Sequence, residues 1–234
     1  MRRALAIVSI CLAAAAAGCG GDDEEKPSSG DTAAPSTSAP STPESTPQAS
    51  GGCEQAQPPE TAERKGKKPK KGALDDGKTY RLKIATNCGE FTIELDQKAA
   101  PNAAASLVGL AEGRYFDNTL FHRIVPGFVV QGGDPTASGS GGPGYSTVDK
   151  PPSDARYTKG VVAMAKAGNE APGTAGSQFF VVVGDDAGLP PDYAVVGKVS
   201  DGLDVVERIG EQGDPATEQP TQTIVIEKAT VEES

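Results

Sequence analysis

One short run of the chain combines a cation, an aromatic ring and an amide: FHRIVPGFVVQGGD, residues 121–134. Arg123 stands between apolar neighbours in an expected strand, and an unpaired buried charge is costly, so this guanidinium is interpreted as functional. A turn at Pro126-Gly127 separates that strand from a second one, which carries Phe128 and Gln131. This set of groups suits a site for a small apolar group attached to a polar backbone.

The same run resembles the signature of the cyclophilin family of peptidyl-prolyl cis-trans isomerases. The resemblance continues through GVVAMA at residues 160–165 and GSQFF at residues 176–180, and it extends from about residue 80 to the end of the chain. It implies a mainly β fold, a closed eight-stranded barrel capped by two α-helices. It also implies isomerase activity without a cofactor or metal, and partners that are proline-containing segments of unfolded or exported proteins.

The resemblance further implies residue roles. Arg123 matches the catalytic arginine, Gln131 is expected to brace it and hold the substrate chain, and Phe128 belongs to the same catalytic set. The expected substrate-binding residues are His122 at the rim, Val129, Met164, Ala165, Lys166, Phe180, Leu189 and Tyr193. Gly188 stands where the best-known members have tryptophan, which argues against strong cyclosporin binding. Phe179 faces the other side of its strand from Phe180 and is expected in the core.

The chemistry of this residue set agrees with that assignment. Rotation about a peptide bond has a barrier of ~18–20 kcal/mol because the nitrogen lone pair is shared with the carbonyl. A donor aimed at the prolyl nitrogen favours the twisted state, in which the lone pair is localised, and needs no nucleophile or metal. A guanidinium that is always charged suits this role.

Two other function classes are alternatives to the isomerase. A non-catalytic proline-peptide binding or chaperone module could use the same fold, but retention of Arg123, Phe128 and Gln131 favours the enzyme. A hydrolase using His122 and Ser177 would need an orienting acid and an oxyanion site, and nothing in the spacing supplies them. The net charge of −10 argues against nucleic acid as a partner.

The first residues are typical of an export signal. Two arginines precede an apolar run, at residues 4–17, that is too short to span a bilayer. The run ends in Ala-Ala-Gly before Cys19, which resembles a bacterial lipobox, and ordinary signal cleavage is the alternative. The prediction is therefore a lipoprotein signal at residues 1–18, lipidation of Cys19, and anchoring of an exported monomer on the extracytoplasmic side of a membrane.

The following segment separates the anchor from the folded part. Residues 20–52 are rich in Ser, Thr, Pro and acidic residues and poor in large apolar side chains, which is typical of a disordered tether. The basic stretch at residues 64–71 is interpreted as a solvated linker or a surface-contact patch. The predicted organisation is a tether at residues 19–78 and an isomerase domain at residues 79–234.

Cysteine usage agrees with export. Cys11 would leave with the signal and Cys19 would carry lipid, so Cys53 and Cys88 remain as an even pair in an oxidising compartment. The prediction is one disulfide between them. A metal site is the alternative, but two cysteines without a nearby histidine or third thiol make a poor ligand set.

The elements that must position the site follow from periodicity. Residues 80–86 and 90–96 alternate apolar and polar side chains around a turn at residues 87–89, which predicts a hairpin. Residues 101–113 begin with proline, carry apolar side chains at helical spacing and end in glycine, which predicts a helix. A second short helix is expected at residues 203–209 and a last strand at residues 223–229. Further strands are expected around Leu120, Val129, Val161, Phe180 and Val195.

Overall fold

The computed structural model describes residues 52–234. The predicted signal peptide, the lipidation site Cys19 and the tether before residue 52 lie outside the described residues, so these remain predictions. Within residues 52–234, no helix has both the length and the apolar character needed to cross a membrane.

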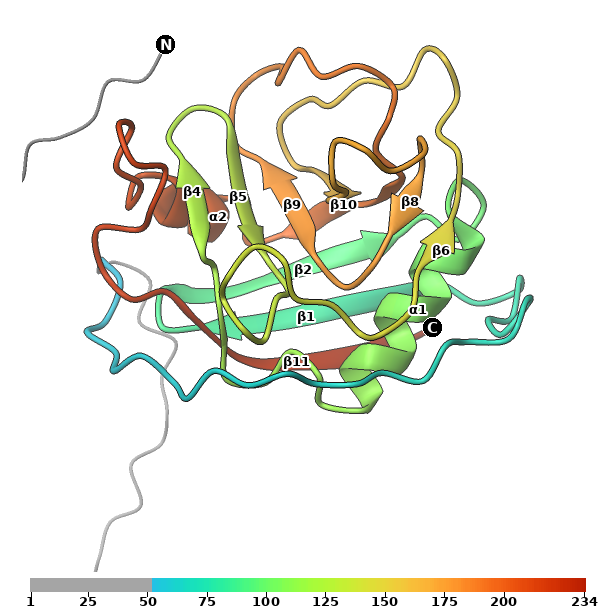
Figure 1. Ribbon diagram of the computed structural model, residues 1–234, viewed down its shortest axis with the longest axis horizontal. Helices are drawn as coiled ribbons and strands as arrows, with labels where there is room; N and C mark the ends of the chain where they lie inside the picture. Colours follow the sequence, from blue (N-terminus) through green and yellow to red (C-terminus); the bar gives the residue numbers. More distant parts are fainter. Residues whose placement is uncertain (1–51) are drawn as a thin grey trace, which may run out of the picture. The chain divides into compact units, whose positions relative to one another are not determined.

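A curled, fully antiparallel sheet of nine strands forms the centre of the structure (Figure 1). Its order is β3-β11-β1-β2-β10-β7-β9-β5-β4, and β6 and β8 form a separate pair. The strand bounds are β1 (Tyr80–Thr86), β2 (Gly89–Leu95), β3 (Thr119–Leu120), β4 (Arg123–Val125), β5 (Val129–Gly132), β6 (Thr147–Val148), β7 (Val161–Met164), β8 (Thr174–Ala175), β9 (Phe179–Val182), β10 (Val195–Asp201) and β11 (Val225–Glu233).

The mainly β prediction is confirmed, but the closed eight-stranded barrel is wrong in detail. The nine-stranded sheet ends at β3 and β4, which are separated only by Phe121 and His122. Periodicity predicted one strand here, but the chain bends so that β3 pairs with β11 while β4 pairs with β5. The predicted hairpin of β1 and β2 is confirmed, with Leu82 opposite Ile93.

Two helices lie on opposite sides of the sheet, as Figure 1 shows. α1 (Pro101–Glu112) begins at a proline, as predicted, and packs beside β11, β1 and β6. α2 (Leu203–Gly210) packs against β2, β4 and β5. Gly202 precedes α2 with φ 72°, and a Cβ there would lie 2.4 Å from the Glu90 carbonyl oxygen, so this entry into α2 requires glycine.

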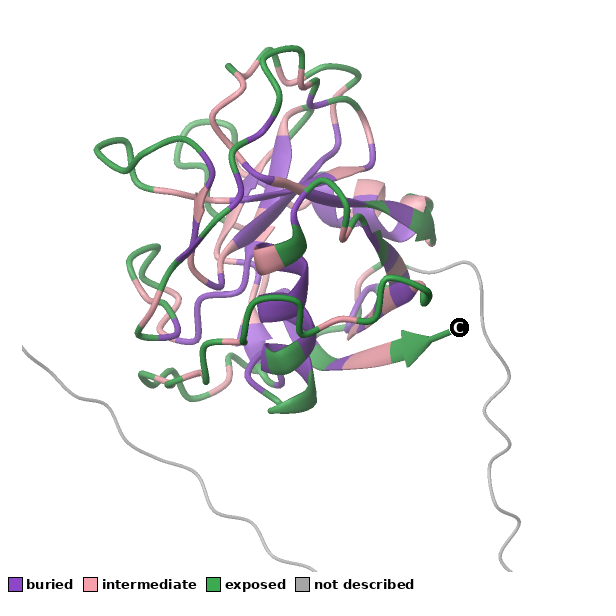
Figure 2. Cartoon of the chain, turned by 90° about the vertical axis from the view of Figure 1, so that its right-hand side faces the viewer, coloured by how far each residue is buried: buried purple, intermediate pink, exposed green. Residues whose placement is uncertain are grey.

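The core divides into two apolar clusters because β9 is buried on both faces. Phe179 belongs to the main cluster, where its ring meets those of Phe116 and Phe121 edge-on at centroid distances of 6.0 and 6.2 Å. Phe180 faces the other way and belongs to a smaller cluster with Tyr157. The prediction that Phe179 is a core residue is therefore confirmed. Figure 2 shows the buried residues concentrated in the sheet and helices and the exposed residues mainly in the loops.

The segment before β1 runs along the outside of the domain and contacts its turns and loops repeatedly. A disulfide joins Cys53 to Cys88, as predicted. The Ala62 N–H donates to the Pro135 carbonyl at 3.2 Å. Arg64 Nη1 donates to the carbonyls of Tyr115 and Asp117 at 2.8 and 2.7 Å, so the basic stretch makes surface contacts. The predicted tether limit at residue 78 remains a prediction, but its last part lies against the domain.

Candidate active site

A cavity of about 290 Å³ opens where β4, β5 and β9 lie side by side. Its wall combines polar groups with aromatic and aliphatic side chains. β4 and β5 supply part of the lining, and the segments after β7 and β9 supply much of the rest. The lining residues are Arg123, Phe128, Val129, Gln131, Ala165, Lys166, Phe180, Leu189 and Tyr193.

The structure brings nine of the eleven predicted catalytic and substrate-binding residues into this cavity. Met164 is the first exception, and its placement in the proline pocket was wrong. Its side chain is fully buried in the main core, because Met164 pairs with Phe179 while the neighbouring Ala163 pairs with Phe180. Along a strand, one step in sequence moves a side chain to the opposite face. His122 is the second exception and does not line the cavity.

Arg123 is held at the cavity wall by three neighbours. Its Nε donates to Glu218 Oε2 at 2.7 Å, and its Nη1 lies 3.5 Å from Gln131 Oε1. The Phe128 ring lies beneath the guanidinium, 6.0 Å from Cζ to the ring centroid. Arg123 also pairs directly with Gln131 in the β4–β5 ladder, so the backbone register already places the two side chains together.

A chain of amides sets the orientation of Gln131. Gln178 Nε2 donates to the Gly141 carbonyl at 2.9 Å, and Gln131 Nε2 donates to Gln178 Oε1 at 3.0 Å. The Gln131 oxygen is thereby left to face Arg123. Gln178 was not predicted as a site residue, although it lies within the GSQFF motif that carries part of the family resemblance.

The apolar side of the cavity is made of rings stacked edge to face. The Phe180 and Tyr193 rings lie 5.5 Å apart at 84°. Tyr157 lies behind them, and its hydroxyl donates to the Tyr193 carbonyl at 2.8 Å and accepts from the Tyr193 N–H at 3.0 Å. Lys166 Nζ lies 5.6 Å from the Tyr193 ring centroid, so a cation sits at the edge of the ring wall. The cavity can therefore hold a flat apolar ring opposite a hydrogen-bond donor.

His122 is half-buried between the cavity and the loop that begins at Asp134. Both ring nitrogens are buried and make no hydrogen bond of good geometry within residues 52–234. Burial lowers the pKa of His122 from 6.5, and the opposing effect of the Asp134 carboxylate does not overcome it. Burial therefore favours the neutral form of the imidazole in the folded protein, which suits a packing role more than contact with substrate.

We expect the free energy of unfolding to fall as the pH drops from 7 through about 6.5 toward 5. In that range the unfolded chain binds a proton at His122, the only histidine in the chain, more readily than the folded chain does. Urea unfolding of the wild type and of His122→Gln at pH 7 and pH 5 tests this, with a smaller pH effect expected for the variant. An NMR titration of His122 that gives a pKa above 6.5 in the folded protein would contradict it.

Ser177 and His122 do not form a nucleophile–base pair. The Ser177 hydroxyl is fully buried, donates to the Gly133 carbonyl at 2.7 Å and meets the Tyr115 hydroxyl at 3.2 Å. It is thus occupied in structural hydrogen bonds and does not line the cavity. The structure gives no support to the hydrolase alternative.

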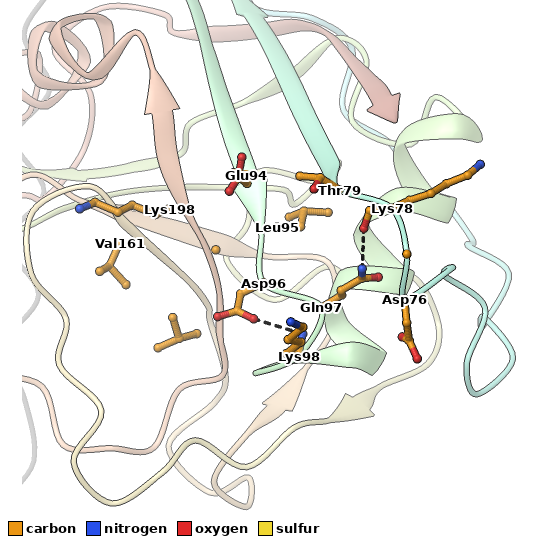
Figure 3. A pocket seen from close by; sticks show the side chains of 13 residues that line it. Asp76, Lys78, Thr79, Glu94, Leu95, Asp96, Gln97, Lys98, Val161 and Lys198 are labelled. Atoms are coloured by element: carbon orange, nitrogen blue, oxygen red, sulfur yellow. Dashed lines mark hydrogen bonds between the residues drawn. The ribbon is translucent and has the colours of Figure 1, made fainter. Parts of the chain in front are cut away.

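A larger hollow of about 490 Å³ lies elsewhere, between the turn before β1, the end of β2 and β10 (Figure 3). Its wall mixes acids and lysines, among them Asp76, Asp96 and Lys198. Gln97 crosses it and donates to the Lys78 carbonyl at 2.7 Å. None of the described residues lining it is aromatic. This hollow lacks the aromatic side chains that line the smaller cavity and can pack against an apolar ring, so we assign the site to the smaller cavity.

Comparison with known proteins defines the class. A sequence profile described as "Cyclophilin type peptidyl-prolyl cis-trans isomerase/CLD" matches residues 81–231. "Peptidyl-prolyl cis-trans isomerase A" of Mycobacterium tuberculosis is 38% identical over 171 residues, covering 65% of this chain and 92% of the relative. "Peptidyl-prolyl cis-trans isomerase B" of Streptomyces anulatus is 38% identical over 168 residues, covering 64% of this chain and 94% of the relative.

The solved structures agree. A cyclophilin-type isomerase of Cryptosporidium parvum superposes with a TM-score of 0.61 at 30% identity, covering 66% of this chain and 98% of the other. A structure of the same protein in the presence of the dipeptide Ala-Pro gives a TM-score of 0.60 at 31% identity, with 65% and 98% coverage. The chain belongs to the cyclophilin family, and it is a cyclophilin-type peptidyl-prolyl cis-trans isomerase.

Proposed function

We propose that the protein accelerates rotation about X-Pro bonds by holding the proline ring in the 290 Å³ cavity beneath Arg123. The observation that carries this proposal is that the Arg123 guanidinium lines the same cavity as the apolar side chains of Phe180 and Leu189. When the proline ring packs against Phe180 and Leu189, the prolyl nitrogen faces the Arg123 guanidinium. The donor then stabilises the twisted peptide, whose lone pair is localised on nitrogen.

Arg123 retains donors for this task. A guanidinium carries five N–H groups, of which Glu218 accepts the one on Nε and Gln131 lies near one on Nη1. Within residues 52–234, Nη2 has no protein acceptor. Substrate can therefore bind Nη2 without breaking a protein contact. Gln131 and the backbone near Lys166 would hold the peptide chain on either side of the proline.

Cis-to-trans relaxation of a short X-Pro peptide tests the proposal, with purified wild type compared with the uncatalysed rate. Faster relaxation that saturates with peptide concentration is the expected result. A wild type that binds proline peptides without accelerating relaxation would support the non-catalytic binding module instead.

We also propose that the enzyme acts outside the cytoplasm as a lipid-anchored monomer that assists the folding of exported proteins. The export-like sequence at residues 1–18, the small residues before Cys19 and the disulfide between Cys53 and Cys88 support this. One acyl chain gives only weak membrane binding, so stable anchoring requires more than one chain at Cys19.

We expect Cys19→Ser to move the protein from the membrane fraction to the soluble fraction. The substitution removes the thiol that would carry the lipid and leaves residues 52–234 unchanged. Expression in a bacterium with fatty-acid labelling, followed by fractionation, measures this. Cys11→Ser is the matched control and should still be labelled. Label on Cys19→Ser equal to that on wild type would contradict the proposal.

A further inference from the structure

We infer that Glu218 is a positioning residue for isomerisation, because its carboxylate fixes the plane of the Arg123 guanidinium. This inference rests on the proposed role of Arg123. Glu218 lies 95 positions beyond Arg123 in the sequence, in the loop between α2 and β11. It lies outside the sequence motifs that carry the family resemblance, and it does not line the cavity. It acts on the substrate only through the arginine.

The ion pair uses Nε, the guanidinium nitrogen nearest the side-chain stem. Glu218 Oε2 accepts from Arg123 Nε at 2.7 Å, a distance typical of a charge-assisted hydrogen bond. A bond at Nε restrains rotation of the guanidinium plane about the end of the side chain. The two Nη atoms are left at the opposite end, where Nη1 approaches Gln131 and Nη2 remains for substrate. Glu218 thus aims the donors without competing for them.

The backbone of Glu218 is tied to the strand that carries Arg123. The Ile124 N–H donates to the Glu218 carbonyl at 2.9 Å. Glu218 is therefore fastened next to the residue that follows the arginine, and its carboxylate has only a short reach to Nε. A freely moving surface carboxylate would lose more side-chain entropy to make the same pair.

Hydrogen bonds within the loop from Gly213 to Pro220 fix its shape next to the Arg123–Glu218 ion pair. The Glu218 N–H donates to the Asp214 carbonyl at 2.8 Å, and the Asp214 N–H donates to the Gln219 carbonyl at 2.8 Å. Glu218 itself adopts φ 59°, a conformation that is unfavourable for residues other than glycine. Such strain persists only where the surroundings impose it, and it is often found at functional sites.

Gly213 lets this loop approach β4. A Cβ at Gly213 would lie 2.4 Å from the Ile124 carbonyl oxygen and 2.8 Å from Pro126 Cδ. A larger residue would therefore push the loop away from β4 and carry Glu218 with it. The loop, its closing hydrogen bonds and its glycine all serve to hold one carboxylate against Arg123.

Glu218→Ala should lower kcat/KM for a short X-Pro peptide by about three- to tenfold, with little change in peptide Kd. Glu218→Gln keeps a neutral acceptor oxygen and should retain more activity than Glu218→Ala. The matched control is Glu94→Gln, which removes the partner of Arg81 in an exposed pair of similar geometry (2.8 Å) on β1 and β2. That control should leave kcat/KM unchanged.

A double-mutant cycle with Arg123→Lys shows whether Glu218 acts through Arg123 or affects activity by another route. Lysine has no Nε–H at the position where Glu218 accepts its hydrogen bond. If Glu218 acts through Nε, Glu218→Ala should lower kcat/KM much less in the Arg123→Lys background than in wild type. Equal losses in both backgrounds, or no loss in wild type, would overturn the inference.

The Nε–H resonance of Arg123 gives a readout that does not depend on activity. Assigned by its loss in Arg123→Lys, it should shift and exchange faster with solvent in Glu218→Ala than in wild type. An unchanged resonance would show that the pair does not form in solution and would overturn the inference. If Arg123→Ala kept full activity while this resonance responded to Glu218, the proposed role of Arg123 would fail and the ion pair would stand.

Discussion

Arg123→Ala should lower kcat/KM for X-Pro isomerisation by about 100- to 1,000-fold, the usual loss when one preorganised donor is removed from an active site. This corresponds to about 3–4 kcal/mol of the ~18–20 kcal/mol rotational barrier. The effect should be large because Arg123 is held in the cavity wall by contacts with Phe128 and Gln131 and keeps Nη2 for the substrate. Peptide relaxation followed by NMR exchange measures it.

Arg81→Ala is the matched control for this experiment. Arg81 is as exposed as Arg123, at 33% against 34% of the side chain, and it also pairs with a glutamate. It lies on β1, which forms no ladder with β4 or β5. Its replacement should leave kcat/KM unchanged. A loss of less than about threefold on Arg123→Ala would contradict the donor mechanism and leave the shape of the cavity as the main source of catalysis.

Phe179→Ala should lower the free energy of unfolding by about 3–5 kcal/mol. The Phe179 ring is 2% exposed and meets the rings of Phe116 and Phe121 edge-on, so its removal leaves a cavity in the main cluster that close-packed neighbours cannot fill. Urea unfolding followed by circular dichroism measures the loss. This loss is a large fraction of the free energy of unfolding of a domain of ordinary stability.

The neighbouring Phe180→Ala is the control, since it removes the same ring from the opposite face of β9. It should cost less stability, because Phe180 belongs to the smaller cluster and borders an open cavity, but it should cost more activity. Weaker peptide binding is expected from the loss of the apolar wall. If Phe180→Ala destabilises the fold more than Phe179→Ala, the division of the core between the two faces is wrong.

Much of the fold was predictable because its signals are local. Alternation of apolar and polar residues located β1 and β2, and a proline followed by helical spacing located α1. Adjacent residues on a strand face opposite ways, which separated Phe179 from Phe180 without any structure. The disulfide between Cys53 and Cys88 followed from counting cysteines. Each of these inferences depends on residues close in sequence or on composition.

The errors arose where side-chain direction depends on a partner strand. Met164 is apolar and lies within a motif of the family, so it was placed in the proline pocket, but its pairing with Phe179 turns it into the core. His122 is predicted at the rim, yet it is half-buried near Asp134, its ring nitrogens are covered, and it does not line the cavity. The bend between β3 and β4 explains why the sheet has nine strands instead of the eight expected.

The class of the protein was recognisable before folding, because the run at residues 121–134 resembles the cyclophilin signature, and its turn at Pro126-Gly127 indicates the hairpin of β4 and β5 that carries Arg123 and Gln131. The groups that surround Arg123 depend on how distant parts of the chain pack together. Glu218 reaches Arg123 across 95 positions, and no periodicity or local propensity links residues so far apart. That contact exists because Gly213 allows the loop to pack on Ile124, a packing event that becomes visible only when the chain is folded.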